Sequence, residues 1–279
     1  MKKNHLILAL FAGAISAILS VACTSQTTSA GSVGVDRQQF ILVSAQEVET
    51  SSAKAYFAEI DKARKAGKLN RDVQQVQRVR AIANKLTPQT VVFRQDAPSW
   101  KWEVNLIESN QLNAWCMAGG KIAFYSGLID KLNLSDDEIA AVMGHEIAHA
   151  LREHARERVS QQVATSLGVN LIAAGLGLGG VGTDLAGMVA NVTISLPYGR
   201  KHEVESDRIG VELAARAGYD PRAAITLWQK MATQSKGGPP ELLSTHPAPE
   251  NRMRDLEDYS VRVQPLYAQA KQKNNGSER

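Results

Sequence analysis

The stretch "GHEIAHALREH", residues 144–154, contains His145, Glu146 and His149 in the spacing H-E-x-x-H. Residues four apart lie on one face of a helix, so the two imidazoles can bind one metal ion. Zinc binds neutral imidazole nitrogens, and a catalytic zinc site keeps one position for water. Glu146 would lie beside that water and accept its proton during attack on a carbonyl group. The spacing therefore predicts one Zn²⁺ per chain in a hydrolytic site.

The alternative is an ordinary helix whose histidines are solvated or packed in the core. The chain has six histidines, and a chance H-E-x-x-H is expected in about 1% of such sequences. Apolar neighbours such as Val142, Ile147 and Leu151 indicate that the motif is buried. Burying two histidines and a glutamate is costly without a partner, which a metal ion provides. The residues that follow are expected to continue the helix into solvent; they are Arg152, Glu153, Arg156, Glu157 and Arg158.

A third metal ligand has to come from elsewhere in the chain. The pattern H-E-x-x-H-x-x-G-x-x-H does not fit, because Arg152 and Ala155 stand where glycine and the third histidine belong. We expect His154 to be a surface histidine on the wrong side of the helix. Further on, Glu203 and Asp207 are four apart and share a helical face. One carboxylate would bind the metal, and the other would hold a ligand histidine by its free N–H.

A helix starting near residue 135 has to position the motif. Ser135 and Glu138 form a capping-box signature, and Asp136 and Asp137 add negative charge where the helix dipole favours it. Apolar periodicity predicts other helices before and after it, over residues 44–68, 70–88, 205–218 and 220–233, with a last one entered from 244–260.

Three short strands are predicted between these helices. Segments 100–109, 112–119 and 120–127 are rich in apolar and aromatic residues, and Gly119–Gly120 is the expected turn between the last two. The glycine-rich segment 168–190 is predicted to be a loop or helical hairpin near the site. Its glycines and Asp184 argue against a membrane span.

The chain of 279 residues is long enough for one large domain or two small ones. Its formal net charge is +4, and the sequence has no Lys/Arg run with interleaved aromatic residues, so nucleic-acid binding is not expected. We divide the chain into a signal peptide (1–22), a lipidated start and flexible tether (23–36), a metal-binding domain (37–262) and a frayed tail (263–279).

The N-terminus predicts export and lipidation. A positive "MKK" precedes an apolar stretch that ends in "LSVA", and Cys23 follows in a context resembling a bacterial lipobox. A plain cleaved signal or a retained anchor is the alternative. Thr24, and not Asp, follows the cysteine; by resemblance to enterobacterial sorting this implies the inner leaflet of the outer membrane, where lipid would anchor the protein. Cys116 is then the one thiol left, and we expect a buried small hydrophobe.

Three motifs together resemble a known family. "GHEIAHALREH", "HEVESD" and "STHPAPENR" are similar to motifs of the gluzincin peptidases that include the CAAX prenyl endopeptidases, HtpX and the Oma-type mitochondrial proteases. The signal and lipobox are most similar to the periplasmic lipoprotein branch, to which LoiP and BepA belong. The resemblance covers roughly residues 70–260 and implies an α+β, mainly helical zincin-type domain with a small sheet beside the active-site helix.

The resemblance also implies roles for individual residues. His145, His149 and Glu203 would bind zinc, Glu146 would be the general base and Asp207 would orient a ligand histidine. His246 would lie near the metal and stabilise an oxyanion or regulate access. The segment "NAWCMAGGKIAFYSGL" would be an edge strand where substrate adds as another strand, with contacts at Asn113, Ala114, Gly119 and Gly120.

By this resemblance the chain would be a zinc metalloendopeptidase that cleaves unfolded or misfolded envelope proteins in the periplasm. Trp115, Cys116 and Ser206 depart from the family pattern without touching the implied metal ligands. Two other functions stay open at this point. One is a metal-stabilised, latent protease acting mainly as a chaperone or assembly factor for outer-membrane proteins. The other is a structural lipoprotein without metal.

Overall fold

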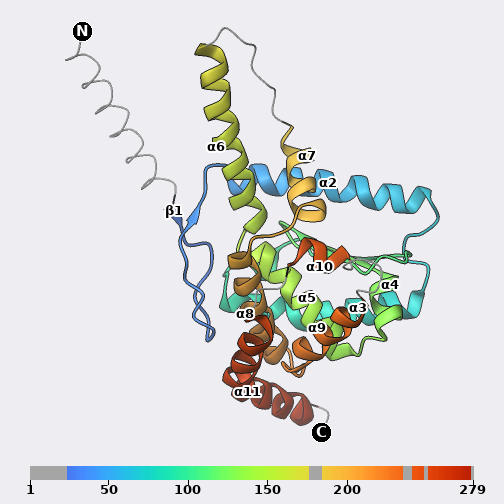
Figure 1. Ribbon diagram of the computed structural model, residues 1–279. Coiled ribbons are helices and arrows are strands. Elements are labelled where there is room, and N and C mark those ends of the chain that lie inside the picture. Colours follow the sequence, from blue (N-terminus) through green and yellow to red (C-terminus); the bar gives the residue numbers. More distant parts are fainter. Residues whose placement is uncertain (1–23, 176–183, 235–240, 248–250, 278–279) are drawn as a thin grey trace.

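The computed structural model describes residues 24–175, 184–234, 241–247 and 251–277, and it shows a mainly helical α+β domain (Figure 1). Two central helices, α5 and α8, cross in its middle, and the small sheet lies beside α5. This confirms the predicted fold class. The helices outside this centre are α2 (Ala45–Lys65), α3 (Val73–Leu86), α4 (Ser126–Leu132), α6 (His154–Gly175), α7 (Leu185–Ala190), α9 (Ala223–Thr233), α10 (Glu241–Thr245) and α11 (Arg252–Ser277).

The sheet has the strand order β3-β5-β4. β5 (Lys121–Tyr125) is central, pairing in parallel with β3 (Glu103–Ile107) and antiparallel with β4 (Ala114–Met117). Gly119 and Gly120 turn the chain between β4 and β5 with φ of +76° and +77°, a conformation that glycine adopts without strain. β4 therefore lies at an edge of the sheet, packed against α5.

The start of α5 (Asp136–Leu151) is fixed by local chemistry. The Ser135 hydroxyl accepts the Glu138 N–H, and the Glu138 carboxylate accepts the Ser135 N–H, which completes the predicted capping box. The end differs from the prediction. α5 stops at Leu151, Glu153 adopts a left-handed φ of +52°, and α6 begins in a new direction at His154.

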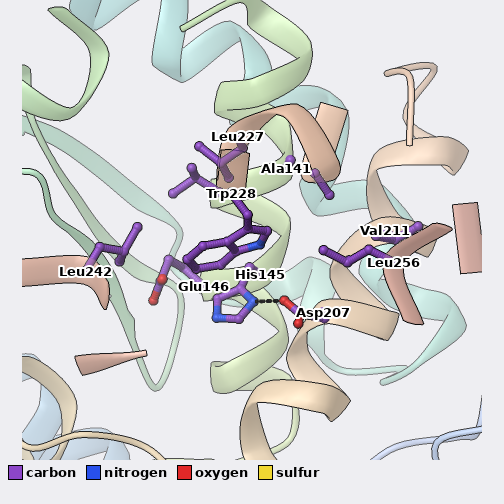
Figure 2. A pocket seen from close by; sticks show the side chains of 11 residues that line it. Ala141, His145, Glu146, Asp207, Val211, Leu227, Trp228, Leu242 and Leu256 are labelled. Carbon is purple, nitrogen blue, oxygen red and sulfur yellow. Dashed lines mark hydrogen bonds and ion pairs between the residues drawn. The ribbon is translucent and has the colours of Figure 1, made fainter. Parts of the chain in front are cut away.

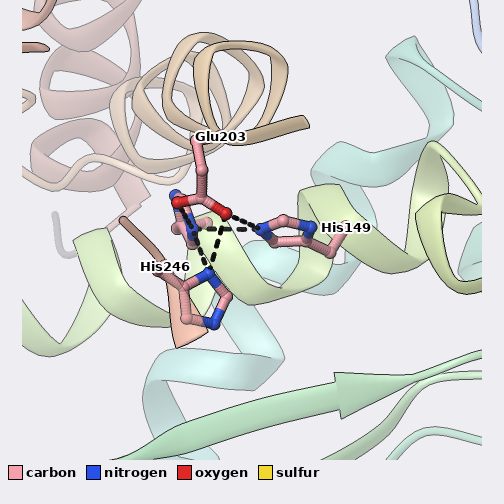
Figure 3. Close-up of side chains that lie close together, drawn as sticks. His149, Glu203 and His246 are labelled. Carbon is pink, nitrogen blue, oxygen red and sulfur yellow. Dashed lines mark hydrogen bonds and ion pairs between the residues drawn. The ribbon is translucent and has the colours of Figure 1, made fainter. Parts of the chain in front are cut away.

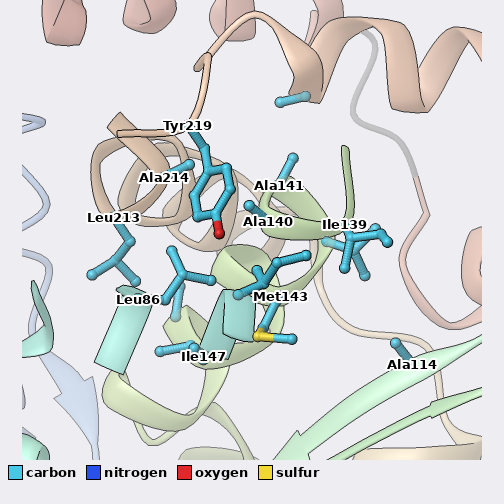
Figure 4. Packing of buried hydrophobic residues seen from close by; sticks show 14 of the residues in the cluster. Leu86, Ala114, Ile139, Ala140, Ala141, Met143, Ile147, Leu213, Ala214 and Tyr219 are labelled. Carbon is cyan, nitrogen blue, oxygen red and sulfur yellow. The ribbon is translucent and has the colours of Figure 1, made fainter. Parts of the chain in front are cut away.

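The hydrophobic core surrounds α5 and fixes its position (Figure 4). Ile139, Met143 and Ile147 from α5 are all fully buried, and Leu86 from α3 and Leu213 from α8 (Arg200–Arg216) pack around the same helix. Sheet and helices cover α5 on several sides, so its polar residues are buried together with its apolar ones.

Residues 24–40 form a segment that we call the N-terminal strap. The prediction of a flexible tether up to residue 36 is wrong for its described part. β1 (Thr24–Ser25) pairs with β2 (Gln39–Phe40), and Val33 and Val35 are buried in the core. The strap is fixed because these two valines and its polar side chains find partners on the domain. The signal peptide and Cys23 lie outside the described residues.

The C-terminal segment also differs from the prediction of a frayed tail. α11 continues through residue 277, and Val263 is fully buried in the core. In the segment 168–190, residues up to 175 continue α6 and α7 follows at 185, while 176–183 lie outside the described residues. Across the described ranges, none of the helices has the length and hydropathy that crossing a membrane would require.

Candidate metal centre

His145, Glu146 and His149 lie near the C-terminal end of α5 and are almost completely buried, with exposed fractions of 5%, 2% and 2%. The two imidazoles are one helical turn apart and face each other with Nε2 atoms separated by 3.1 Å. The H-E-x-x-H spacing therefore brings two nitrogen donors to one point inside the domain.

α8 crosses α5 at this point and adds two carboxylates. One Glu203 oxygen lies 3.4 Å from His149 Nε2, and the other lies 3.5 Å from His145 Nε2. Asp207 is one turn further along α8 and contacts His145 Nδ1 at 3.0 Å, on the opposite side of that ring. The two acidic residues thus have different places: Glu203 faces both Nε2 atoms, and Asp207 lies behind His145.

His246 follows α10 and completes the cluster (Figure 3). Its Nδ1 is 3.1 Å from a Glu203 oxygen and 3.2 Å from His145 Nε2. One ligand atom from each of His145, His149, Glu203 and His246 lies within 4.8 Å of the other three. His246 therefore lies in the ligand cluster itself, as well as near the predicted catalytic residues.

The chemistry of these donors fits a zinc ion. Three imidazole nitrogens and one carboxylate converge in a buried space, and these are the donor types that zinc binds. The lone pairs of facing nitrogens repel unless protons or a cation lie between them. Glu146 adds a second observation, because its Oε1 is buried without a hydrogen-bond partner. Such an oxygen is expected where water enters the site.

Burial and charge set the state of the acidic residues. Burial raises the pKa of Glu146, and His246 and His145 oppose that shift. Burial would also raise the pKa of Glu203, but His246, His149 and His145 hold it well below the usual range. Glu203 is thus held in its anionic form, whereas Glu146 has the raised pKa that suits a proton acceptor.

Arg252 binds the two α8 carboxylates, those of Glu203 and Asp207. Its guanidinium donates to Asp207 at 2.8 Å and to Glu203 at 3.2 Å, and it stacks on the Trp228 ring at 3.5 Å from the centroid. Figure 2 shows Trp228 and Leu242 lining a small, mostly apolar pocket beside His145 and Glu146. This apolar wall explains why burial acts so strongly on Glu146.

His154 is not the surface residue that we predicted. It is fully buried, and its Nδ1 lies 2.9 Å from Nδ1 of His149. Arg152 and Glu157 are buried as well, although the helix was expected to continue into solvent. The reason is the break at Glu153, which turns the chain back towards α8 and the strap. Tyr198, stacked on His246 at 5.2 Å, is a further neighbour of the site that the sequence analysis missed.

The predicted substrate-binding residues lie along the sheet edge. Asn113 precedes β4, Ala114 is its first residue, and Gly119 and Gly120 follow it; all four are buried. A pocket of about 290 Å³ opens between this turn, the start of α2 and His149. Cys116 lines it and is otherwise a core residue with a pKa raised by burial, as predicted for a buried hydrophobe.

Fold and site together define the class: a helical metallopeptidase domain with histidines and a carboxylate from two crossing helices. The model of Peptidase family M48 matches residues 74–260, and the chain belongs to this family. Among its curated relatives, "Mitochondrial metalloendopeptidase OMA1" of Schizosaccharomyces pombe is 36% identical over 166 residues, 59% of this chain and 48% of that protein.

Bacterial relatives match the same part of the chain. "Beta-barrel assembly-enhancing protease" of Escherichia coli K12 is 31% identical over 174 residues, 59% of this chain and 36% of the relative. "Metalloendopeptidase OMA1, mitochondrial" of Bos taurus is 32% identical over 195 residues, 64% of this chain and 36% of that protein. The chain thus spans half or less of the length of these relatives.

Proposed function

We propose that this chain is a zinc-dependent endopeptidase of the bacterial cell envelope, which hydrolyses peptide bonds in unfolded or misassembled proteins. The convergence of His145, His149, Glu203 and His246 on one buried point carries the proposal, together with the family membership. A lipid on Cys23 would anchor the enzyme to the inner leaflet of the outer membrane and place it among periplasmic substrates.

His145, His149 and Glu203 would hold the zinc ion, which supplies Lewis-acid chemistry when bound. Glu146 accepts a proton from the attacking water through its Oε1, which has no hydrogen-bond partner and lies 3.5 Å from Nε2 of His246, and later delivers it to the leaving amine. Asp207 accepts the Nδ1–H of His145 and so directs the Nε2 lone pair of that ring into the site. The chain thereby provides the base and orients the ligands.

Substrate would extend the sheet at β4. An edge strand can pair with an extended peptide through main-chain hydrogen bonds, largely independent of sequence. Such pairing suits a protease that acts on unfolded segments, because extended backbone is what these proteins expose. Asn113, Ala114, Gly119 and Gly120 flank that edge, and the pocket beside Gly119 and His149 would take a substrate side chain.

A second candidate function is favoured by His246. Its Nδ1 lies among the ligand atoms, where it would take the position that a reacting water needs. The chain would then be a metal-stabilised, latent protease that acts mainly as a chaperone or assembly factor for outer-membrane proteins. The name of the Escherichia coli relative, "Beta-barrel assembly-enhancing protease", suits both functions.

Zinc content and casein cleavage of the purified protein test these proposals together, with His149→Ala as the comparison. About one zinc per chain that is lost in His149→Ala, with chelator-sensitive cleavage, is the result expected of the endopeptidase. If the wild type binds zinc but does not cleave casein, and His246→Ala gains cleavage, the latent form would be favoured. A folded wild-type protein without zinc would overturn both.

A further inference from the structure

A buried polar cluster lies behind His149, on the side of this ring that faces away from the other metal ligands. It contains His154 from the start of α6, Glu205 from α8 and Arg37 from the strap. Their exposed fractions are low for His154 and Glu205, at 0% and 7%. Proposed catalysis uses none of the three, so the cluster requires another explanation.

The hydrogen bonds from His149 to Glu205 have only one consistent direction. His149 would bind metal through Nε2, so its Nδ1 carries the proton and donates it to Nδ1 of His154 at 2.9 Å. His154 then carries its own proton on Nε2, which donates to Glu205 Oε2 at 2.9 Å. A neutral histidine thus links a carboxylate to a metal ligand.

Glu205 is itself fixed by two arginines. Arg152 Nε donates to its Oε2 at 3.1 Å, and Arg37 Nε donates to its Oε1. Arg37 also binds Glu157 with both terminal nitrogens, at 2.7 and 2.8 Å. The carboxylate that receives the His154 proton is therefore held by a residue of the strap, 168 positions earlier in the chain.

The break after α5 makes this arrangement possible. In an uninterrupted helix a residue five positions after His149 would lie about 140° around the axis from it. Glu153 instead takes a φ of +52°, and this left-handed residue returns His154 to the His149 ring. A non-glycine residue in that conformation costs free energy, which the surrounding contacts have to offset.

We propose that His154 is a positioning residue for the metal ligand His149, and that Glu205 with Arg37 of the strap holds His154 in place. This role of His154 rests on the proposed zinc site. Asp207 acts directly on His145, whereas Glu205 acts on His149 through a second imidazole. The strap is thus part of the support of the metal centre, and zinc affinity depends on its docking.

The test is zinc affinity, measured on folded protein by competition with a chromophoric chelator. In His154→Phe an aromatic ring, somewhat larger than imidazole, is kept but the hydrogen bonds to His149 and Glu205 are lost, so the zinc Kd is expected to rise about 10- to 100-fold. His154→Gln, which can accept and donate, should recover part of that loss. Glu205→Gln and Arg37→Met should raise the Kd in the same direction by smaller factors.

His202→Phe is the matched control. His202 lies in the same cluster, stacks on His154 at 4.3 Å between ring centroids and binds Glu157 at 3.1 Å. Its substitution should lower thermal stability and leave the zinc Kd unchanged, since within the described part of the chain it contacts Glu157, His154 and Tyr198 and no proposed metal ligand.

An unchanged Kd in His154→Phe would overturn the proposal. If that variant does not fold, an unchanged Kd in both Glu205→Gln and Arg37→Met would do so. An equal rise in His202→Phe would also contradict it, because general loosening of the cluster would then explain the effect. A wild-type protein that binds no zinc would instead refute the proposed function, and this proposal with it.

Discussion

Gly144 of α5 and Gly210 of α8 lie against each other where the two helices cross. A Cβ atom on Gly144 would lie 2.8 Å from the Gly210 carbonyl oxygen, and one on Gly210 would lie 2.7 Å from the backbone nitrogen of His145. These distances are shorter than any normal contact, so only glycine permits this crossing. The approach of the two backbones sets the 3.0 Å distance between His145 and Asp207.

Replacing Gly210 by Ala should therefore disturb the metal site from a distance. The new methyl group has to push α8 away from α5, and such overpacking costs about 1–3 kcal/mol, partly offset by the better helix propensity of alanine. We expect lower stability in urea and a weaker zinc affinity in Gly210→Ala. Wild-type values for both would mean that the helices adjust without moving the ligands.

Glu146→Gln should separate catalysis from metal binding. The amide keeps the shape of the side chain but cannot accept a proton, and general-base catalysis contributes about 10²- to 10⁴-fold. We expect kcat on an unfolded substrate to fall by about 10²-fold or more while zinc content stays near one per chain. Equal cleavage by the variant and the wild type would remove Glu146 from the mechanism.

The sequence alone could predict the parts of the site that follow from helical spacing. His145 and His149, and likewise Glu203 and Asp207, are four apart, and the structure places each pair on one helical face. His154 could not be placed in this way. Neither glycine nor proline marks the break at residues 152–153, so the periodicity continues through it. Only the contacts with α8 and the strap reveal that the helix ends there.

Arg252→Met should destabilise the protein more than a typical loss of charge. Arg252 is 3% exposed and pairs with Glu203 and Asp207, so its removal leaves two buried carboxylates without their cation. We expect a loss of about 3–5 kcal/mol in the metal-free protein. Denaturation in the presence of a chelator measures this.

Arg208→Met is the matched control for that measurement. Arg208 lies on α8 and pairs with Asp255, but its side chain is 29% exposed. A pair of this kind contributes about 1 kcal/mol or less. Similar losses in the two variants would show that burial of the Arg252 site has little influence on stability.

The Glu157 carboxylate should make the strap sensitive to acid. Burial would raise its pKa, but hydrogen bonds from Arg37, His202 and Gln39 hold it far below its usual value of 4.5. Its folded-state pKa is thus lower than its unfolded one. The resulting stabilisation is complete above pH 4.5 and is lost as the pH falls below that value.

Comparing wild type with Glu157→Gln tests this dependence. The difference in unfolding free energy should be largest near neutral pH and should shrink as the pH is lowered from about 5 to 3. Urea denaturation across this range measures it. A difference that stays constant with pH would show that Glu157 contributes through packing instead of charge.

The strap could not be predicted from composition. Its Ser, Thr and Gly content is typical of linkers, and two valines are a weak signal of burial. Its docking depends on partners far along the chain, such as Glu205 for Arg37 and Arg152 for Thr28. Polar contacts between distant residues leave no local pattern, so the structure was needed to find them.

The ends of the two crossing helices add a fixed electric field to the site. α5 ends at Leu151, so its negative C-terminal end lies near His149 and favours a cation. α8 begins at Arg200, so Glu203 lies in its first turn, where the positive end of the helix favours an anionic side chain. Peptide dipoles produce this field, and no side-chain substitution removes it. In single-ligand variants such as His149→Ala, the start of α8 should therefore still favour an ionised Glu203.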